Sequence, residues 1–360
     1  MRAGRALCID WMNRPVNSLS CALRRSAALL CSGCAALLCA TACGSPFPLR
    51  PDAGDPGAAI TDAGDGDAGD GDAGNGDAGS PTVAGCAIFP SDNAWNRDIS
   101  GDPVDPHSAD YLSHMNAQTL FLHADFGSNP LYGQPFILVH GNQPRQPMTF
   151  LYASESDPGP YPFPPDIPIQ AGQQSTGDRH AMALDIDNCV SYETYLTYWE
   201  TDHFDCGSGA VFDLKTNQLR PDTWTSATAS GLPIVAGMTR YHEVVELGEL
   251  RHAVTFNVGS TAPFFVHPAT HQSGTSSDPY APPMGLRVRL RADYDLSRFH
   301  GAALTILKGL RRYGMMVVDN GTDWYISGEQ DTRWDDADLN QLKTVPGSAF
   351  EVILLPPLQH

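Results

Sequence analysis

The sequence contains few basic residues for its length. Only 22 of its 360 residues are Lys or Arg, against 41 Asp and Glu, which gives a formal net charge of −19. Proteins that bind nucleic acid or anionic lipid headgroups do so mainly through clustered Lys and Arg side chains. The acidic composition therefore predicts no nucleic-acid partner, and attachment to a membrane must come from something other than a basic surface.

Several sequence signatures of enzymes are also missing. Residues 83–360 contain no Gly-X-Ser-X-Gly elbow, no phosphate-binding P-loop and no dinucleotide-binding glycine fingerprint. The sequence thus gives no support for a serine hydrolase, a nucleotide-driven enzyme or a redox enzyme.

Cysteine is scarce after residue 43. Only Cys86, Cys189 and Cys206 follow, and no two of them have the close spacing of a zinc-ligand pair. In an oxidising compartment two of the three could form a disulfide, and the sequence does not choose among the three bonds. The short loop between Cys189 and Cys206 favours that pair, which would leave Cys86 free.

The N-terminal region lacks an apolar run of typical membrane-spanning length, but it has the features of an export signal. An Arg-Arg pair precedes sixteen mostly apolar residues, 27–42, whereas a span needs about 20. The segment Leu38–Cys43 resembles a bacterial lipoprotein signal, which implies that residues 1–42 are removed and that Cys43 receives lipid. A single transmembrane anchor is the alternative. We expect an exported protein held by lipid at the outer membrane, in the periplasm or on the cell surface.

Residues 43–82 are predicted to be a disordered linker that follows the lipidated cysteine. Between Asp52 and Gly79 the chain repeats Asp-Ala-Gly and Gly-Asp, with eight aspartates and no Lys, Arg or aromatic residue. Such a segment repels itself and has no side chains with which to build a core. A calcium-binding Gly/Asp repeat is the alternative, but the regular aliphatic position of such repeats is missing. Residues 83–360 are then expected to form a single globular domain.

The pattern of this domain is mainly that of short strands. Apolar or alternating runs bounded by Gly, Pro, Asn or Asp are typical of strands, and they cover residues 136–139, 148–152, 181–186, 190–198, 210–214, 251–258, 264–266 and 286–290. Residues 246–249 are the predicted turn of a long hairpin that joins residues 240–245 to 251–258. Helical spacing occurs over residues 108–118, 302–313 and 335–343. We expect a mainly β fold, with a β-sandwich or jelly-roll-like core and a few peripheral α-helices.

Several distinctive motifs are spread along the domain. They include Cys86-Ala-Ile-Phe-Pro, Gly177-Asp-Arg-His, Ser208-Gly-Ala-Val-Phe-Asp-Leu and Asp319-Asn-Gly-Thr-Asp-Trp-Tyr. Together the motifs resemble a family of secreted bacterial proteins, lipoproteins among them, to which no activity is assigned. The resemblance spans about residues 86–352. The resemblance implies a single domain in an exported protein, and it implies no particular activity.

Two groups of side chains are candidates for acid–base chemistry. Arg179 and His180 stand just before a predicted strand, and a histidine beside a cation and a carboxylate can move protons near neutrality. A structural Asp–Arg pair at a turn is the alternative. On the predicted hairpin, Tyr241, His242 and His252 form the kind of group that a polysaccharide lyase uses to abstract a proton. An ordinary solvated hairpin face would account for them equally.

A pair of histidines on a predicted loop leaves open whether the protein binds a metal. His267 and His271 are four residues apart, but Pro268 argues against the helix that would align them on one zinc ion. On a loop they could still join other histidines around a divalent metal, although no full ligand set is visible in the sequence. The metal and any other cofactor therefore stay unknown, and His271 is kept as a candidate catalytic residue.

Four further residues are candidates for substrate binding. Arg287 and Arg289 alternate with apolar residues, so a strand would present both guanidinium groups on one face, where they could bind uronate or sulfate. Neutralisation by the domain's own carboxylates is the alternative. Trp324 and Tyr325 lie in a carboxylate-rich segment, and aromatic rings beside paired carboxylates are typical of clefts that process sugars.

We therefore expect an enzyme that acts on an extracellular glycan or another small molecule, as a polysaccharide hydrolase or lyase. A non-catalytic carbohydrate-binding or surface-binding lipoprotein is the competing interpretation. Sandwich folds host both classes, so the fold alone does not separate them. Convergence of the candidate residues in one pocket would favour the enzyme.

Overall fold

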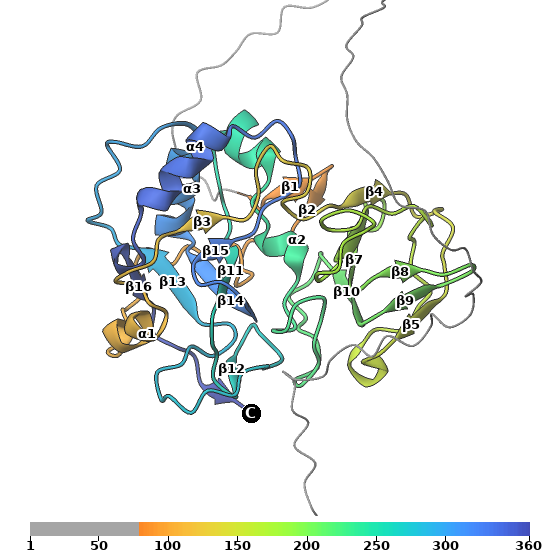
Figure 1. Ribbon diagram of the computed structural model, residues 1–360, viewed down its shortest axis with the longest axis horizontal. Helices are drawn as coiled ribbons and strands as arrows, with labels where there is room; N and C mark the ends of the chain where they lie inside the picture. The colour runs from red at the N-terminus through yellow and green to blue at the C-terminus, as the bar shows by residue number, and fades with distance from the viewer. Residues whose placement is uncertain (1–78) are drawn as a thin grey trace, which may run out of the picture. The chain divides into compact units, whose positions relative to one another are not determined.

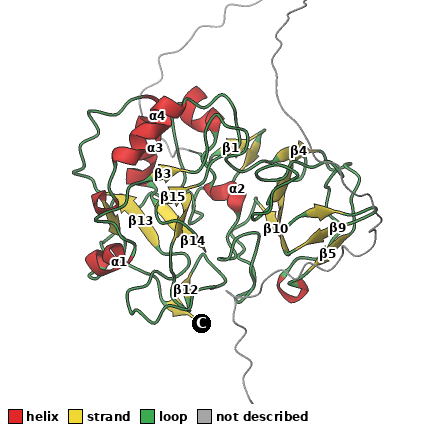
Figure 2. Ribbon diagram, viewed as in Figure 1, coloured by secondary structure: helices red, strands yellow, loops and turns green. Residues whose placement is uncertain are grey.

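The computed structural model describes residues 79–360 of the chain. The predicted signal peptide, Cys43 and almost all of the predicted linker lie outside the described residues. Within them, seventeen strands in several sheets stand against four α-helices, so the predicted mainly β fold with a few helices is confirmed (Figures 1 and 2). No helix in residues 79–360 combines the length and the apolar character that crossing a membrane requires.

The largest sheet has six strands of mixed direction. Its order is β16 (Phe350–Val352), β13 (Arg287–Leu290), β14 (Met315–Asn320), β11 (Val254–Val258), β15 (Tyr325–Ile326) and β3 (His123–Ala124). The central strands β11 and β14 run parallel, with Val254 opposite Met315. The first four residues of β14 are buried, and its last two, Asp319 and Asn320, are half-buried. The middle of the sheet thus ends in a carboxylate at the edge of the core.

Helices cover this sheet. α3 (Gly301–Arg312) packs on β13 and lies beside α4 (Asp336–Asn340), as Figure 1 shows. Its buried side chains have the helical spacing expected for a core-facing stripe and include Ala302, Ala303, Ile306, Leu307 and Leu310. The helix stops before Gly314, which has a φ of 71° and no room for a Cβ, since one would lie 2.3 Å from the Val288 carbonyl oxygen. The helices predicted over residues 302–313 and 108–118 are confirmed as α3 and the shorter α1 (Ser108–His114).

Two other sheets pack against each other. The four-stranded sheet has the order β10 (Ser208–Asp213), β7 (Val190–Tyr195), β6 (Ala181–Asp185) and β4 (Ile137–Val139), and the three-stranded sheet has the order β5 (Met148–Phe150), β9 (Phe204–Cys206) and β8 (Tyr198–Trp199). Both contribute to one apolar cluster around Tyr161 and Phe163. The opposite face of the four-stranded sheet adds Leu184, Ala210 and Phe212 to the main core that the six-stranded sheet forms. Because both its faces are covered, β6 is buried along its whole length.

The remaining elements are short. They are β1 (Thr82–Val83), β2 (Cys86–Ala87), β12 (Phe265–Val266), β17 (Leu358–Gln359), α2 (Ile234–Gly237), a π-helical turn at His242–Glu246 and 3₁₀ turns at Ala153–Glu155, Gln341–Thr344 and Gly347–Ala349. Of these, α2 connects two layers: it contacts β11, and the buried Glu193 of β7 accepts hydrogen bonds from the Ile234 and Val235 amides at 2.7 and 3.1 Å. Burial raises the pKa of Glu193 to about 7, although these hydrogen bonds act to lower it.

The predicted hairpin over residues 240–258 is wrong. Only β11 is a strand, and the first arm is the π-helical turn. In a strand Arg240 and Glu243 would point to opposite faces, whereas the turn brings their side chains together as a buried ion pair. His252 joins them, with its Nε2 atom 3.0 Å from Glu243 Oε2. A buried carboxylate needs such partners, and this requirement overrides the apolar pattern of the segment.

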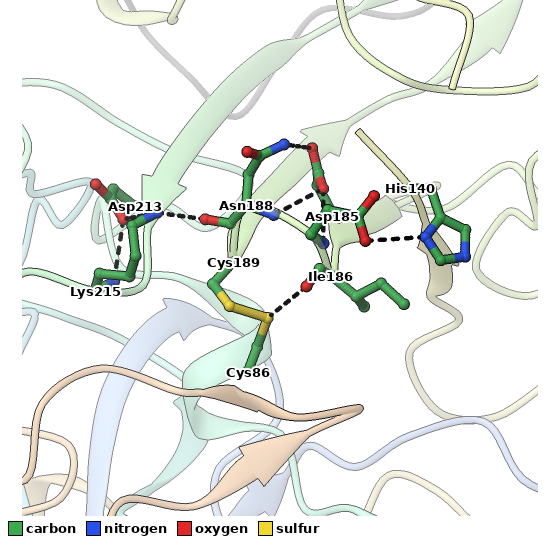
Figure 3. The surroundings of a disulfide bond; sticks show 9 residues. Cys86, His140, Asp185, Ile186, Asn188, Cys189, Asp213 and Lys215 are labelled. Carbon is green, nitrogen blue, oxygen red and sulfur yellow. Dashed lines mark hydrogen bonds and ion pairs between the residues drawn. A yellow bond between two sulfur atoms is a disulfide. The ribbon is translucent and has the colours of Figure 1, made fainter. Parts of the chain in front are cut away.

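The predicted disulfide is also wrong. The structure joins Cys86 to Cys189, with Cα atoms 5.4 Å apart, and leaves Cys206 buried as a free thiol (Figure 3). Cys189 precedes Val190 at one end of β7, and Cys206 lies near the other end, where Ser208 pairs with Tyr195. The six residues of β7 place these ends roughly 17 Å apart, whereas a disulfide needs Cα atoms within about 7 Å. Proximity in sequence was misleading because β7 separates the two cysteines.

Candidate functional site

Arg179, a predicted catalytic residue, holds a loop. Its side chain is buried. It donates from Nε to the Thr197 carbonyl at 3.0 Å and from Nη1 to the Gln173 and Ser175 carbonyls at 2.8 Å each. With these donors engaged, the guanidinium fixes the segment that leads into β6 and does not reach a substrate.

His180 is a core residue as well. Its Nδ1 atom lies 2.8 Å from the Gln170 side-chain oxygen, and its Nε2 atom lies 2.9 Å from the Ala227 carbonyl oxygen. Burial lowers the pKa of His180, although the nearby Asp178 opposes this shift. A buried ring with both nitrogens engaged has no open position for a substrate proton. Its bond to Ala227 instead ties the loop over residues 226–230 to the four-stranded sheet.

The residues of the predicted hairpin form a separate cluster. His252 is fully buried on Glu243 and, through Nδ1, lies 2.7 Å from the Ala253 carbonyl oxygen. His242 is exposed and pairs with Glu246 at 2.7 Å. Tyr241 packs edge-on against Trp334, with 5.2 Å between ring centroids. His180 and His252 therefore do not converge in one pocket, because each is hydrogen-bonded inside the core to different partners.

Arg287 and Arg289, the two arginines predicted to bind substrate, are also buried. Arg287 donates to the carbonyls of Tyr313, Ala94 and Arg97, and burial lowers its pKa to about 9. Arg289 bonds to Glu351 at 2.8 Å. Both guanidiniums anchor chain segments behind β13, so neither is available to a uronate.

Of the two predicted aromatic sugar contacts, only one remains near the surface. Trp324 is fully buried and donates from Nε1 to the Met115 carbonyl at 2.7 Å. Tyr325 is half-buried and stacks on the His123 ring, with 4.5 Å between centroids. Trp324 is thus a core residue, not a platform for a sugar.

One loop brings three candidate elements together. In residues 226–230, the Ala227 carbonyl accepts the bond from His180 described above. The Ala229 amide donates to Asp319 Oδ2 at 3.2 Å, and the Ala229 carbonyl accepts from His271 Nδ1 at 2.7 Å. The loop thereby connects the start of β6, the end of β14 and the segment around His271.

Asp319 has the electrostatics of a proton donor. Burial, helped by the charge of the Asp178 carboxylate, raises its pKa to about 7, while the amides of Ala229 and Asn320 partly oppose the rise. The residue as a whole is half-buried, while its carboxyl group lies in a buried environment. A carboxyl group that stays protonated near neutrality is typical of a general acid.

Asp178 is the shared neighbour of this region. Its side chain is exposed, and its charge raises the pKa not only of Asp319 but also of Asp125 and Tyr195, in each case after burial as the main cause. The pKa of Tyr195 reaches about 12. We refer to Asp125, Asp178, Tyr195 and Asp319 as the carboxylate site. Its two central carboxyl groups, Asp178 and Asp319, differ in environment, one exposed and one half-buried, and such a difference separates the roles of base and acid.

A groove of about 380 Å³ lies beside His271, whose ring is hydrogen-bonded to the Ala229 carbonyl. It is lined by Glu155, Trp224, Phe265, His271 and Gln272, among others. His271 Nε2 lies 3.7 Å from Glu155 Oε2. His271 is thus a predicted catalytic histidine that lines this groove. Its companion His267 pairs with Asp222 at 2.9 Å and lines a different groove, of about 300 Å³.

No group of three or more His, Cys, Asp or Glu side chains within residues 79–360 is arranged to hold a metal ion. The comparisons with known proteins add no assignment: no family model, curated protein sequence or solved structure matches the chain. The site must therefore be interpreted from its own chemistry.

Sequence reasoning did not select the residues that matter most here. Asp178 and Asp319 stand in the motifs Gly177-Asp-Arg-His and Asp319-Asn-Gly. The catalytic and substrate-binding roles were predicted for their histidine and aromatic neighbours instead. A carboxylate that directly follows the apolar run of β14 was the available signal, because such a group ends a buried strand at the edge of the core.

Proposed function

We propose that this domain is an enzyme that cleaves an extracellular polysaccharide with a pair of carboxyl groups. The observation that carries the proposal is the pairing of the half-buried Asp319, whose pKa is about 7, with the exposed Asp178 that helps to raise it. Glycosidic cleavage uses one carboxylic acid to protonate the leaving oxygen and one carboxylate to activate water or attack the sugar. Asp319 fits the first role and Asp178 the second.

Hydrolysis fits the charges better than elimination does. Elimination from a uronate needs a cation that stabilises the substrate carboxylate. Both arginines suggested for that purpose are buried and bonded to the protein itself, as described above. An anionic sugar would also be repelled by the exposed Asp178 carboxylate, so a neutral or cationic glycan is the favoured substrate.

The test is turnover of a panel of neutral, amino-sugar and uronate polysaccharides by the wild type and by Asp319→Asn and Asp178→Asn. We expect reducing ends to be released from a neutral or amino-sugar polymer, with each variant slower by about 10²–10⁴-fold, the usual contribution of a positioned acid or base. A matched control is Glu193→Gln, which alters a carboxyl of similarly raised pKa that only caps α2. Wild-type activity in the Asp319 variant would refute the assignment.

The competing class is a non-catalytic glycan-binding protein. The burial of His180 and His252 favours it, because neither can act as the acid or base that the sequence predicted. Saturable binding of an oligosaccharide without turnover of any polymer on the panel would select this class.

We also propose that the protein is exported and held in the cell envelope by lipid on Cys43. The support is the resemblance of Leu38–Cys43 to a lipoprotein signal. Cys43→Ala should move the protein from the membrane fraction to the soluble fraction. Unchanged membrane retention of the variant would remove the lipid anchor.

A further inference from the structure

An exposed aromatic ring stands beside the carboxylate site. Tyr198 belongs to β8, where its neighbour Trp199 packs into the apolar cluster shared by the two smaller sheets. Successive strand residues point to opposite faces, and Tyr198 is 42% exposed. Strand geometry thus holds this ring at the surface while Trp199 anchors the strand.

Arg179 supports the ring from one side. The centre of its guanidinium lies 4.1 Å from the centroid of the Tyr198 ring, which is close for a cation–π contact. The three carbonyl bonds already described fix that guanidinium. The backbone of Arg179 has a φ of 52°, a conformation that residues with a Cβ rarely adopt. Such strain is often maintained at functional positions because it places a particular group.

The same backbone contacts place the ring next to the proposed chemistry. The Leu196 amide donates to the Asp178 carbonyl at 2.8 Å, and the Thr197 amide donates to the Arg179 carbonyl at 3.3 Å. The segment from Tyr195 to Tyr198 therefore runs along the loop that carries Asp178. Tyr195 of the carboxylate site precedes Tyr198 by three residues.

We infer that Tyr198, supported by Arg179, is the stacking platform of a sugar-binding subsite next to Asp178. With one face of the ring held by a fixed cation, the other face is available to the apolar face of a sugar ring. The ordering cost of binding is low, because the platform is already in position. This inference rests on the proposed function for its substrate class and assigns Arg179 a positioning role rather than a catalytic one.

The experiment measures binding separately from turnover. In the Asp319→Asn background, titration calorimetry with cello-hexaose and chito-hexaose should show binding of at least one oligosaccharide. Tyr198→Ala should weaken it by about tenfold or more, as truncation of an aromatic anchor does, and Tyr198→Phe should preserve it because the ring remains. Phe121→Ala is the matched control, since Phe121 is 45% exposed at an isolated bridge to Pro346. In the otherwise wild-type chain, Tyr198→Ala should raise KM and leave kcat within about twofold.

Each outcome bears on the inference. Equal affinity of Tyr198→Ala and its parent, equal loss in Tyr198→Phe, or no binding of either oligosaccharide would overturn it. Binding that depends on Tyr198 without any polymer turnover would uphold the subsite and refute the proposed enzyme. Unchanged thermal unfolding of Tyr198→Ala confirms that the loss is not a folding defect.

Discussion

Replacing Asp319 with Asn should stabilise the protein, and more so at high pH. The pKa of Asp319 rises from 3.8 to about 7 on folding, mainly through burial. An acid whose pKa is raised in the folded state costs nothing below about pH 4, where both states are protonated. The cost grows as the pH rises from about 4 to 7 and is complete above 7. The amide introduced by Asp319→Asn has no proton to lose, so the variant avoids this cost.

The size of the effect follows from the shift. At about 1.4 kcal/mol for each pKa unit, the wild type carries a cost of about 1–2 kcal/mol at pH 5 and about 4 kcal/mol at pH 8. The variant also loses part of the hydrogen bonding from the Ala229 and Asn320 amides, a loss of about 1 kcal/mol that is the same at both pH values. The stability difference between variant and wild type should therefore grow by about 2–3 kcal/mol from pH 5 to pH 8.

Urea unfolding of the full chain at the two pH values measures this change directly. Other carboxyls with raised pKa, Glu193 and Glu329, change the stability of both proteins equally and cancel in the comparison. A difference between variant and wild type that does not change with pH would refute the raised pKa of Asp319, and with it the argument for its role as an acid. The same variant should be more stable and less active, which is the usual relation at a catalytic group.

Two further predictions concern stability. Replacing Cys86 or Cys189 with Ser should lower the free energy of unfolding by about 2–5 kcal/mol, because their bond closes a loop with a sequence separation of 103; denaturant unfolding identical to the wild type would contradict the bond. Glu243→Ala should cost about 3–5 kcal/mol, because the buried Arg240 would lose its counter-charge and His252 its hydrogen-bond partner. An equally stable Glu243→Ala variant, by the same measurement, would mean that the cluster is not closed to solvent.

Local signals predicted the helices and many of the strands, since each of the eight runs predicted as strands contains an observed strand. Apolar spacing and Gly314 were sufficient to place α3, and Asp335 does cap α4, accepting bonds from the Ala337 and Asp338 amides. β14 was not predicted. Its buried run begins directly after the helix, and an apolar segment of this length has no alternation that distinguishes a strand from a helix.

The contacts of the candidate site could not be predicted in the same way. Arg179 and His180 were correctly singled out as unusual, but their partners, Thr197 and Ala227, lie outside the local motif. Which of Asp178, Arg179 and His180 faces solvent depends on how β6 and the loop over residues 226–230 pack. The exposed residue turned out to be Asp178, because the two side chains after it are held by distant carbonyl and side-chain oxygens.

The Cys86–Cys189 bond determines where the domain would bear tension if it were pulled from its N-terminal side. Force applied at residue 79 can straighten β1 and its turn, but it reaches a covalent link at Cys86 and passes to the turn between β6 and β7. The chain from residue 87 to residue 188, which includes Asp178 and its loop, lies inside the closed loop and carries no load. Pulling the domain from its N-terminal side would therefore leave the backbone around Asp125 and Asp178 without tension, while Tyr195 and Asp319 lie beyond Cys189 on the part of the chain that bears the force.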